Sequence, residues 1–208
     1  MNITLIIILV TLFTSYKCFQ SQSLFNKLKN HPYSVVKNRE YYRLITSGFV
    51  HGDWVHLIVN MFVLYEFGKI VESIYIELFG QLTGIIFYLA MYFIVLILAD
   101  IPSLRQHHNH PSFSSIGASG AVSGVLFTYI LFYPWSWLGL FFVIPIPAVV
   151  FGILYLVYST WASKSKKDNI DHSAHFAGAI AGMLIIIILH PKVINLFLER
   201  ITQFQGPF

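Results

Sequence analysis

Charged side chains are scarce in this 208-residue chain. Asp, Glu, Lys and Arg make up 11% of it, whereas about a quarter is usual in soluble domains. This deficit excludes an ordinary soluble domain, and a mean hydropathy of +0.68 indicates a membrane protein. Cysteine is also nearly absent. The single Cys18 excludes an internal disulfide and a cysteine-based metal site, so packing within lipid must hold the fold.

Six apolar stretches are long enough to cross a bilayer, which takes about 20 helical residues. They are about 2–17, 54–74, 82–100, 116–133, 141–161 and 173–190. The first lacks the basic start and nearby cleavage site of a signal peptide, so we expect it to remain as a span. Pro145 and Pro147 are expected to mark the start of the fifth. The sequence thus predicts an all-α, multi-pass membrane protein with one domain, residues 1–208.

The basic residues are spread along connections rather than gathered in a patch with aromatic residues, which argues against a nucleic-acid partner. Most of them lie in the first, third and fifth connections, so the positive-inside rule places those connections in the cytoplasm. His107, His108 and His110 form a run in the third connection. Without carboxylate or cysteine support, we expect a solvated loop there rather than a metal site.

Four polar side chains stand near the starts of three predicted spans, where lipid makes them costly unless they face the bundle interior or water. His56 and Asn60 share one face of the second span. Ser119 opens the fourth span, and His175 lies about one turn into the sixth. With alternating topology, all three starts lie on one side of the membrane. A serine and a histidine at matching depth can act as nucleophile and general base, and His56 and Asn60 can donate hydrogen bonds to an oxyanion.

Each of these residues also has a structural interpretation. A serine near a helix start often caps the helix or bonds back to a carbonyl, and a histidine or asparagine within a span often joins helices. Their joint occurrence at one depth favours the catalytic hypothesis. A transporter would instead require polar residues along the depth of several spans, whereas here they gather at one end.

Two glycine pairs have the spacing that lets membrane helices approach closely. Gly120 and Gly124 lie in the fourth span, and Gly178 and Gly182 lie in the sixth. Each pair begins just inward of the candidate serine or histidine. We therefore expect contact between these two helices to bring the hydroxyl and the imidazole together.

Together these residues resemble the rhomboid family of intramembrane serine proteases over nearly the whole chain. The segment "GASG" at 117–120 is similar to the family's G-x-S-G, and "HGDWVHLIVN" at 51–60 is similar to its H-x-x-x-x-H-x-x-x-N. The segment "AHFAGAIAG" at 174–182 matches its A-H-x-x-G-x-x-x-G. Two further segments resemble family motifs. They are "YYRLITSGFVH" in the first loop, with Tyr42 in place of a tryptophan before Arg43, and "FGKIVE" at 67–72.

The resemblance implies a six-transmembrane-helix rhomboid-like bundle with a Ser119–His175 dyad in a water-filled cavity. It implies an oxyanion hole made by the Ser119 backbone N–H, His56 and Asn60. The residues to which it gives packing or supporting roles are Gly117, Gly120, Gly124, Gly178, Gly182, Arg43, Glu72 and His51. It also implies that no metal or other cofactor is needed.

The implied activity is that of a serine endopeptidase that cleaves the transmembrane segments of single-span membrane proteins within the bilayer. A bacterial-type member would lie in the inner membrane, with its termini in the cytoplasm and its site outside, against the charge count. The alternative is a catalytically idle relative that binds membrane helices without cutting them. Such a relative is expected to have lost the serine or the histidine, and both are present here.

Three positions call for separate predictions. Asp171 precedes His175 by one turn, and we expect a charge at the helix start rather than a third catalytic carboxylate. Ser123 stands where the family commonly has an aromatic ring beneath the imidazole. Its hydroxyl either bonds the carbonyl four residues back, which we favour in lipid, or reaches His175. Ile76 occupies a position where the family often has a glycine, and Gly80 follows later.

Overall fold

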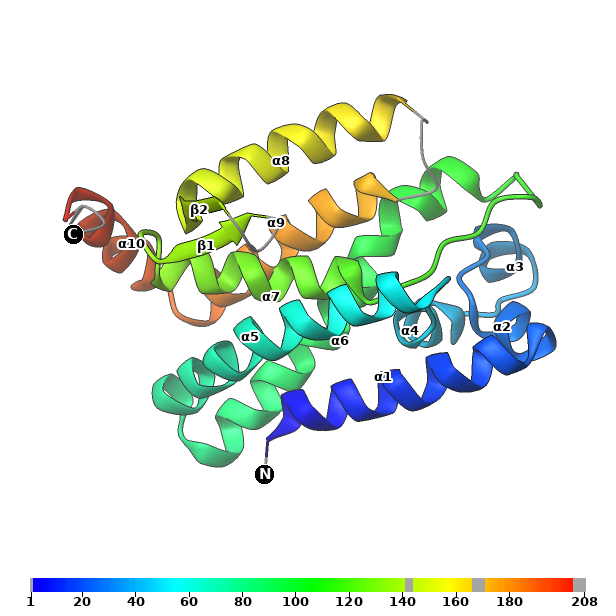
Figure 1. Ribbon diagram of the computed structural model, residues 1–208, viewed down its shortest axis with the longest axis horizontal. Helices are drawn as coiled ribbons and strands as arrows, with labels where there is room; N and C mark the ends of the chain where they lie inside the picture. The colour runs from blue at the N-terminus through cyan, green and yellow to red at the C-terminus, as the bar shows by residue number, and fades with distance from the viewer. Residues whose placement is uncertain (1, 141–143, 166–170, 204–208) are drawn as a thin grey trace.

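The computed structural model describes residues 2–140, 144–165 and 171–203 of the chain. Within these ranges it is a bundle of long helices with short helices in the connections (Figure 1). The elements are α1 (Ile3–Gln20), α2 (Gln22–Leu28), α3 (Pro32–Lys37), α4 (Arg43–Thr46), a 3-10 turn (Ser47–Phe49), α5 (Trp54–Phe79), α6 (Gln81–His107), α7 (Ser119–Phe132), β1 (Trp137–Leu140), β2 (Ile144–Pro147), α8 (Ala148–Ser165), α9 (His172–Leu189) and α10 (Val193–Thr202).

A helix coincides with each of the six predicted spans, and the prediction of a mainly helical membrane protein is confirmed. By length and composition, α1, α6 and α9 are suited to cross a membrane, whereas α7 and the segment Ala148–Lys164 of α8 are shorter apolar helices. Helix α5 has 26 residues but carries several charged side chains. The count of six spans therefore stays a prediction.

The predicted start of the fifth span at 141 was wrong. An antiparallel hairpin, in which Trp137 pairs with Pro147, precedes the helix, and α8 begins at Ala148. Residues 141–143 lie outside the described residues, as do Lys166 and Lys167 of the fifth connection. The proline-rich segment "IPIP" thus ends a strand directly before the helix, which agrees with a proline mark at the helix start.

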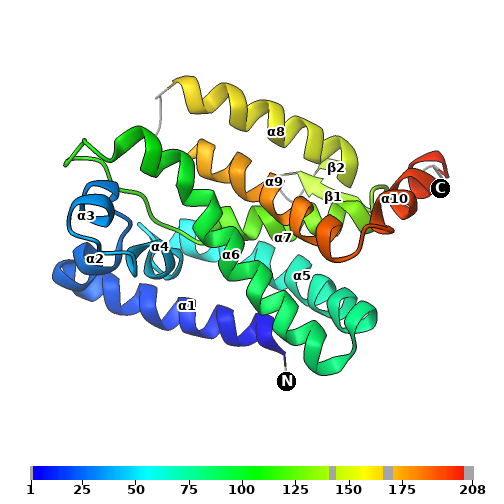
Figure 2. The ribbon, with the colours of Figure 1, turned by 180° about the vertical axis from the view of Figure 1, so that it is seen from behind.

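Helix α7 forms the centre of the bundle, and Figures 1 and 2 show α5, α6, α8 and α9 around it. Every residue from Gly120 to Phe132 is buried. Helix α1 packs against α5 on one side of the bundle, and α8 packs against α9 on the other. Short helices α2, α3 and α4 gather at one end of the bundle, and the hairpin and α10 lie at the other (Figure 1).

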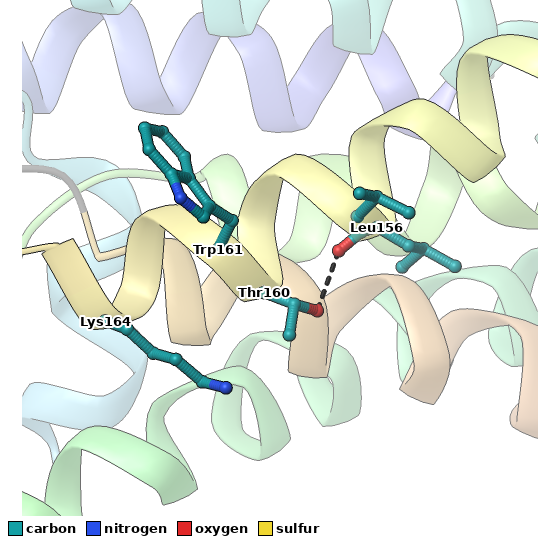
Figure 3. A pocket seen from close by; sticks show the side chains of 5 residues that line it. Leu156, Thr160, Trp161 and Lys164 are labelled. Atoms are coloured by element: carbon teal, nitrogen blue, oxygen red, sulfur yellow. Dashed lines mark hydrogen bonds between the residues drawn. The ribbon is translucent and has the colours of Figure 1, made fainter.

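The outer face of α8 has a shallow hollow lined by Leu156, Val157, Thr160, Trp161 and Lys164 (Figure 3). The Trp161 side chain is 58% exposed. Tryptophan and lysine near the end of an apolar helix are typical of the membrane interface, where an aromatic ring or a flexible cation meets the headgroups. We therefore interpret this hollow as lipid-facing surface.

Helices α7 and α9 meet along their glycines. A Cβ atom on Gly178 would lie 2.1 Å from the carbonyl oxygen of Gly120, and one on Gly182 would lie 2.3 Å from that of Gly124. The Thr128 hydroxyl donates to the carbonyl of Gly124 at 2.9 Å and is also 3.2 Å from that of Gly182. The two backbones are therefore closer than any side chain would allow.

Glu72 of α5 ties the start of α1 to the bundle. Its buried carboxylate accepts the backbone N–H groups of Ile3 at 2.8 Å and Thr4 at 2.9 Å, together with the Thr4 hydroxyl at 2.7 Å. Since the Thr4 proton points to Glu72, the hydroxyl of Tyr88 in α6 donates to Thr4 at 2.9 Å. One carboxylate thus satisfies helix-start donors that lipid could not.

The first connection is held by Arg43, which is largely buried. Its guanidinium donates to the carbonyls of Asn26 and Lys29, each at 2.9 Å, and forms an ion pair with Glu40. This ion pair holds the pKa of the Glu40 carboxyl below its usual value. The bonds give the connection a defined shape beside the starts of α5 and α7. Farther along the chain, Gly80 with φ +82° makes the turn between α5 and α6.

We predict that Gly178→Ala lowers the free energy of unfolding by about 3 kcal/mol, because the added methyl group would overlap the α7 backbone. Thermal unfolding in detergent measures the loss. The matched control is Gly152→Ala in α8, where a Cβ would meet only side chains, the nearest atom being 3.1 Å away. An equal, small effect for both variants would contradict the proposed role of the glycine contact.

Candidate active site

One cavity, of about 1530 Å³, gathers the polar residues singled out from the sequence. Ser119 lines it from the first residue of α7, and His175 lines it from the first turns of α9. His56 and Asn60 line it from α5. The prediction that three helix starts converge is therefore met by the geometry of the fold.

Helix α7 is shorter than the hydrocarbon core of a bilayer is thick. Fourteen residues span about 21 Å, against about 30 Å for the hydrocarbon core. The far end of α7 is followed by Tyr133 and Trp135, aromatic residues of the kind found at the interface. If that end lies at the interface and α7 stands upright in the bilayer, Ser119 is expected on the order of 10 Å below the opposite surface. A reaction with water at this depth requires the cavity.

Ser119 and His175 are hydrogen-bonded, with the serine Oγ 2.7 Å from the imidazole Nε2. The two side chains come from helix starts that the glycine contact holds together. Asp171 caps α9 by accepting the N–H of Ala174 at 3.0 Å, which fixes where the helix begins and so how deep His175 lies. The pair has the distance that proton transfer from a nucleophile to a base requires.

The start of α7 is built differently from the starts of α5 and α9, which carry the other candidate site residues. Within the described ranges, no side chain caps it, whereas Asp53 caps α5 by accepting the N–H of His56 at 2.8 Å. Gly117 has φ +109°, and a Cβ there would lie 2.9 Å from the His56 ring. Glycine is therefore required on both conformational and steric grounds. An uncapped helix start beside Ser119 can receive a negatively charged oxygen.

His51 holds the loop that carries the serine. The Ser15 hydroxyl donates to the carbonyl of Phe49 at 2.9 Å, so it must accept from the His51 Nδ1–H at 3.0 Å. The Nε2 atom is then the acceptor for the N–H of Ala118, 3.4 Å away. Complete burial and, to a smaller extent, the nearby His56 lower the pKa of His51 to about 3. The neutral imidazole thus links α1 to the residue before Ser119.

Asn60 lies one turn deeper than His56 on the same face of α5. Its side-chain amide donates one hydrogen bond to the His56 carbonyl at 2.9 Å. An amide nitrogen carries two N–H groups, so a second donor remains for the cavity. The His56 ring packs edge-on against His51, with 4.8 Å between ring centroids. Both expected oxyanion donors are therefore oriented by local contacts.

A profile of the Rhomboid domain matches residues 38–192, which include Ser119, His175, His56 and Asn60. The chain belongs to the rhomboid family. Similar proteins include the mitochondrial RHOMBOID-like protein 12 of Arabidopsis thaliana, 31% identical over 181 residues that cover 80% of this chain and 52% of the relative. The mitochondrial Rhomboid protein 1 of Saccharomyces cerevisiae is 26% identical, over 68% of this chain and 40% of its own length.

The chloroplastic Rhomboid-like protein 11 of Arabidopsis thaliana is 28% identical over 72% of the chain and 52% of the relative. This rhomboid therefore spans about half the length, or less, of these curated relatives. Their names place them in mitochondria and chloroplasts, which gives no support to the bacterial inner membrane expected from the sequence. The family and the apolar helices support an integral membrane protein.

Ser123 has the local bond favoured from the sequence, and this prediction is confirmed. Its hydroxyl donates to the carbonyl of Ser119 at 2.7 Å. It also meets the hydroxyl of Tyr155 in α8 at 2.5 Å. The ring of Tyr155 is nearly parallel to that of His175, with centroids 6.2 Å apart and planes 22° apart. The aromatic neighbour of the imidazole thus comes from α8, which the sequence analysis missed.

Asp171 stands at the N-cap of α9, in agreement with the expected charge at the helix start. Besides the N–H of Ala174, its carboxylate accepts the hydroxyls of Ser173, at 2.6 Å, and Ser103 of α6. His172, which the sequence analysis also missed, is buried and lines the cavity one turn before the candidate base. A histidine at that spacing was the available signal.

The histidine run of the third connection has ring contacts. The His107 ring stacks on that of Phe113, with 3.7 Å between ring centroids. The centroid of the His110 ring lies 5.8 Å from that of His107. His31 of the first connection also reaches this loop, because its Nε2 is 2.7 Å from the carbonyl oxygen of Pro111. In the described part of the chain, no three His, Cys, Asp or Glu residues are grouped to hold a metal ion.

We predict that the low pKa of His51 makes the fold sensitive to acid. The unfolded chain takes up a proton near pH 6.5, whereas folded His51 stays neutral down to about 3. Its contribution to stability is complete above pH 6.5 and is lost as the pH falls, by about 2 kcal/mol at pH 5.

The measurement compares unfolding of the wild type and His51→Gln in detergent at pH 7 and pH 5. The variant should lose about 2 kcal/mol less than the wild type over this interval. His108→Gln, in the third connection, is the control and should behave as the wild type does. Equal losses for the wild type and His51→Gln would show that His51 does not bear the acid sensitivity.

Proposed function

We propose that this rhomboid is an intramembrane serine endopeptidase that cleaves transmembrane segments of membrane proteins with a Ser119–His175 dyad. The observation that carries the proposal is the 2.7 Å hydrogen bond between Ser119 Oγ and His175 Nε2, inside a cavity that reaches into the bundle. A serine hydroxyl is a weak nucleophile by itself, and an adjacent imidazole activates it.

In the proposed reaction, Ser119 Oγ bonds to the carbonyl carbon of the substrate while His175 Nε2 takes its proton. The same imidazole then gives this proton to the leaving amine as the C–N bond breaks. Water from the cavity attacks the resulting ester in the second half, again losing a proton to His175. The bond between the acyl carbon and Ser119 Oγ then breaks, His175 returns the proton to Oγ, and the second product leaves as a carboxylic acid.

The negative charge on the substrate oxygen would be stabilised at the uncapped start of α7. The backbone N–H of Ser119 is one donor, and the second amide hydrogen of Asn60 and the His56 imidazole are the others. Each lies on the wall of the same cavity. Gly117 supports this role, since its conformation makes the turn into the uncapped helix.

Single-span membrane proteins fit the cavity as substrates. Between α5 and α8 its walls are apolar, with Val55, Val59 and Val63 on one side and Phe151 on the other. Val55 is 73% exposed and faces the surroundings that lipid would fill. A transmembrane helix hides its main chain behind side chains, so a locally unwound segment must enter the cavity before Ser119 can reach a carbonyl.

The second candidate is an idle relative that binds membrane helices without cutting them. The same apolar walls would serve this function. The intact Ser119–His175 pair favours the protease, because helix binding alone has no use for a serine bonded to an imidazole.

We predict that purified protein in lipid vesicles cleaves a single-span substrate and that Ser119→Ala abolishes this cleavage. Labelling with a fluorophosphonate should occur in the wild type and be lost in Ser119→Ala, because the probe requires an activated serine. Ser73→Ala, which changes an exposed serine of α5 that does not line the cavity, is the control and should label as the wild type does. Cleavage that persists without Ser119 would exclude the serine mechanism, and folded protein that binds substrate without cutting or labelling would support the idle relative.

We predict that Asp171→Asn keeps activity within about tenfold of the wild type, because asparagine caps a helix nearly as well as aspartate. The partners of the carboxylate are the helix start and the hydroxyls of Ser173 and Ser103. Initial rates of substrate cleavage test this. A loss of about a thousandfold or more, in protein of unchanged thermal stability, would instead identify the carboxylate as an orienting group of a triad.

A further inference from the structure

Two aromatic rings from different helices neighbour the imidazole of His175. The Tyr155 ring of α8 is nearly parallel to it, and the His172 ring of α9 stands edge-on at 5.8 Å between centroids. A histidine side chain turns about two bonds, and the second of these rotates broadly. The neighbouring rings leave less space for this rotation, and Nε2 is directed to Ser119.

The Tyr155 ring is itself fixed by a chain of hydrogen bonds. Ser123 has one hydroxyl proton and donates it to the carbonyl of Ser119 at 2.7 Å. The 2.5 Å contact between the two hydroxyls therefore requires Tyr155 to be the donor and Ser123 the acceptor. These two hydrogen bonds connect the Tyr155 hydroxyl through Ser123 to the backbone of Ser119. The position of the Tyr155 ring is therefore fixed relative to the nucleophile.

Packing supports the same arrangement. The Tyr155 ring contacts Phe127 of α7, with centroids 5.6 Å apart, and Phe151 of its own helix, with centroids 5.9 Å apart. Ser123 is buried, with 4% of its surface exposed. A larger side chain at position 123 would occupy the space of the Tyr155 hydroxyl. The small side chain of Ser123 therefore leaves the space that the Tyr155 hydroxyl occupies.

We propose that Tyr155 is a positioning residue for His175 and that Ser123 fixes Tyr155 in place. The inference rests on the proposed function for its kinetic consequence, because an aligned imidazole matters to a serine nucleophile. Its structural content is independent of activity, namely that the orientation of the His175 ring depends on a tyrosine of α8.

The kinetic test uses four variants in lipid vesicles with a single-span substrate. Tyr155→Phe and Ser123→Ala each remove the hydrogen bond between the hydroxyls and should lower kcat about tenfold. The double variant should be no slower than the slower single variant, since both changes break the same bond. Tyr155→Leu removes the ring as well and should lower kcat about a hundredfold. In the three variants that keep the ring at position 155, KM should stay within about threefold, because the wall of the cavity keeps its aromatic side chain.

The matched control is Tyr158→Phe, which removes a hydroxyl from an exposed tyrosine of the same helix and should leave kcat unchanged. Thermal unfolding separates positioning from folding. A kcat about tenfold higher in Tyr155→Phe than in Tyr155→Leu would identify the ring as a positioning feature in addition to the hydroxyl. Wild-type kcat in Tyr155→Leu would overturn the proposal. Additive losses in the double variant would overturn the role of Ser123.

A second readout does not need activity. The NMR signals of the His175 ring, assigned through His175→Asn, carry the ring-current shift of a neighbouring aromatic side chain. Tyr155→Leu should remove this shift, whereas Tyr158→Phe should keep it. An unchanged His175 signal in Tyr155→Leu would overturn the proposal even if cleavage were reduced. If the wild type neither cuts nor labels at Ser119 while this shift is present, the protease proposal fails and the positioning by Tyr155 stands.

Discussion

The close approach of α7 and α9 is the contact on which the candidate site depends. Lipid provides no hydrophobic force between helices, so they must associate by van der Waals packing and by hydrogen bonds. Where a side chain would stand on Gly178 or Gly182, the carbonyl oxygens of α7 are found instead. Because Ser119 and His175 lie at the starts of these two helices, the backbone contact fixes the distance between the hydroxyl and the imidazole.

Helix starts in this protein are treated in two ways. The starts of α5 and α9 are capped by Asp53 and Asp171, and Glu72 accepts the first N–H groups of α1. These carboxylates satisfy donors that lipid would leave without partners. The start of α7 has no such side chain within the described residues. Of the three helix starts that bring the candidate site residues together, those of α5 and α9 are capped and that of α7 is not, so free backbone donors lie beside the candidate nucleophile.

Contacts from outside these two helices set the finer geometry. His51 stays neutral because it is buried, and only the neutral ring can both donate to Ser15 and accept from Ala118. It thereby fixes the loop that leads into α7. On the opposite side of the dyad, Tyr155 of α8 lies beside the base. The nucleophile and the base are thus each held by a neighbour that is distant in the sequence.

The sequence by itself determined those features that follow from local periodicity. A helix repeats every 3.6 residues, so the spacing of His56 and Asn60 put both on one face, and the bond from Ser123 to the carbonyl four residues back could be foreseen. Only the tertiary structure decided that the pairing of strand 137–140 with strand 144–147 precedes α8 and that the Tyr155 ring lies beside that of His175. Which residue of α8 faces the imidazole depends on the rotation and depth of that helix against α9. Side-chain packing between two apolar surfaces sets both, and no local pattern encodes it.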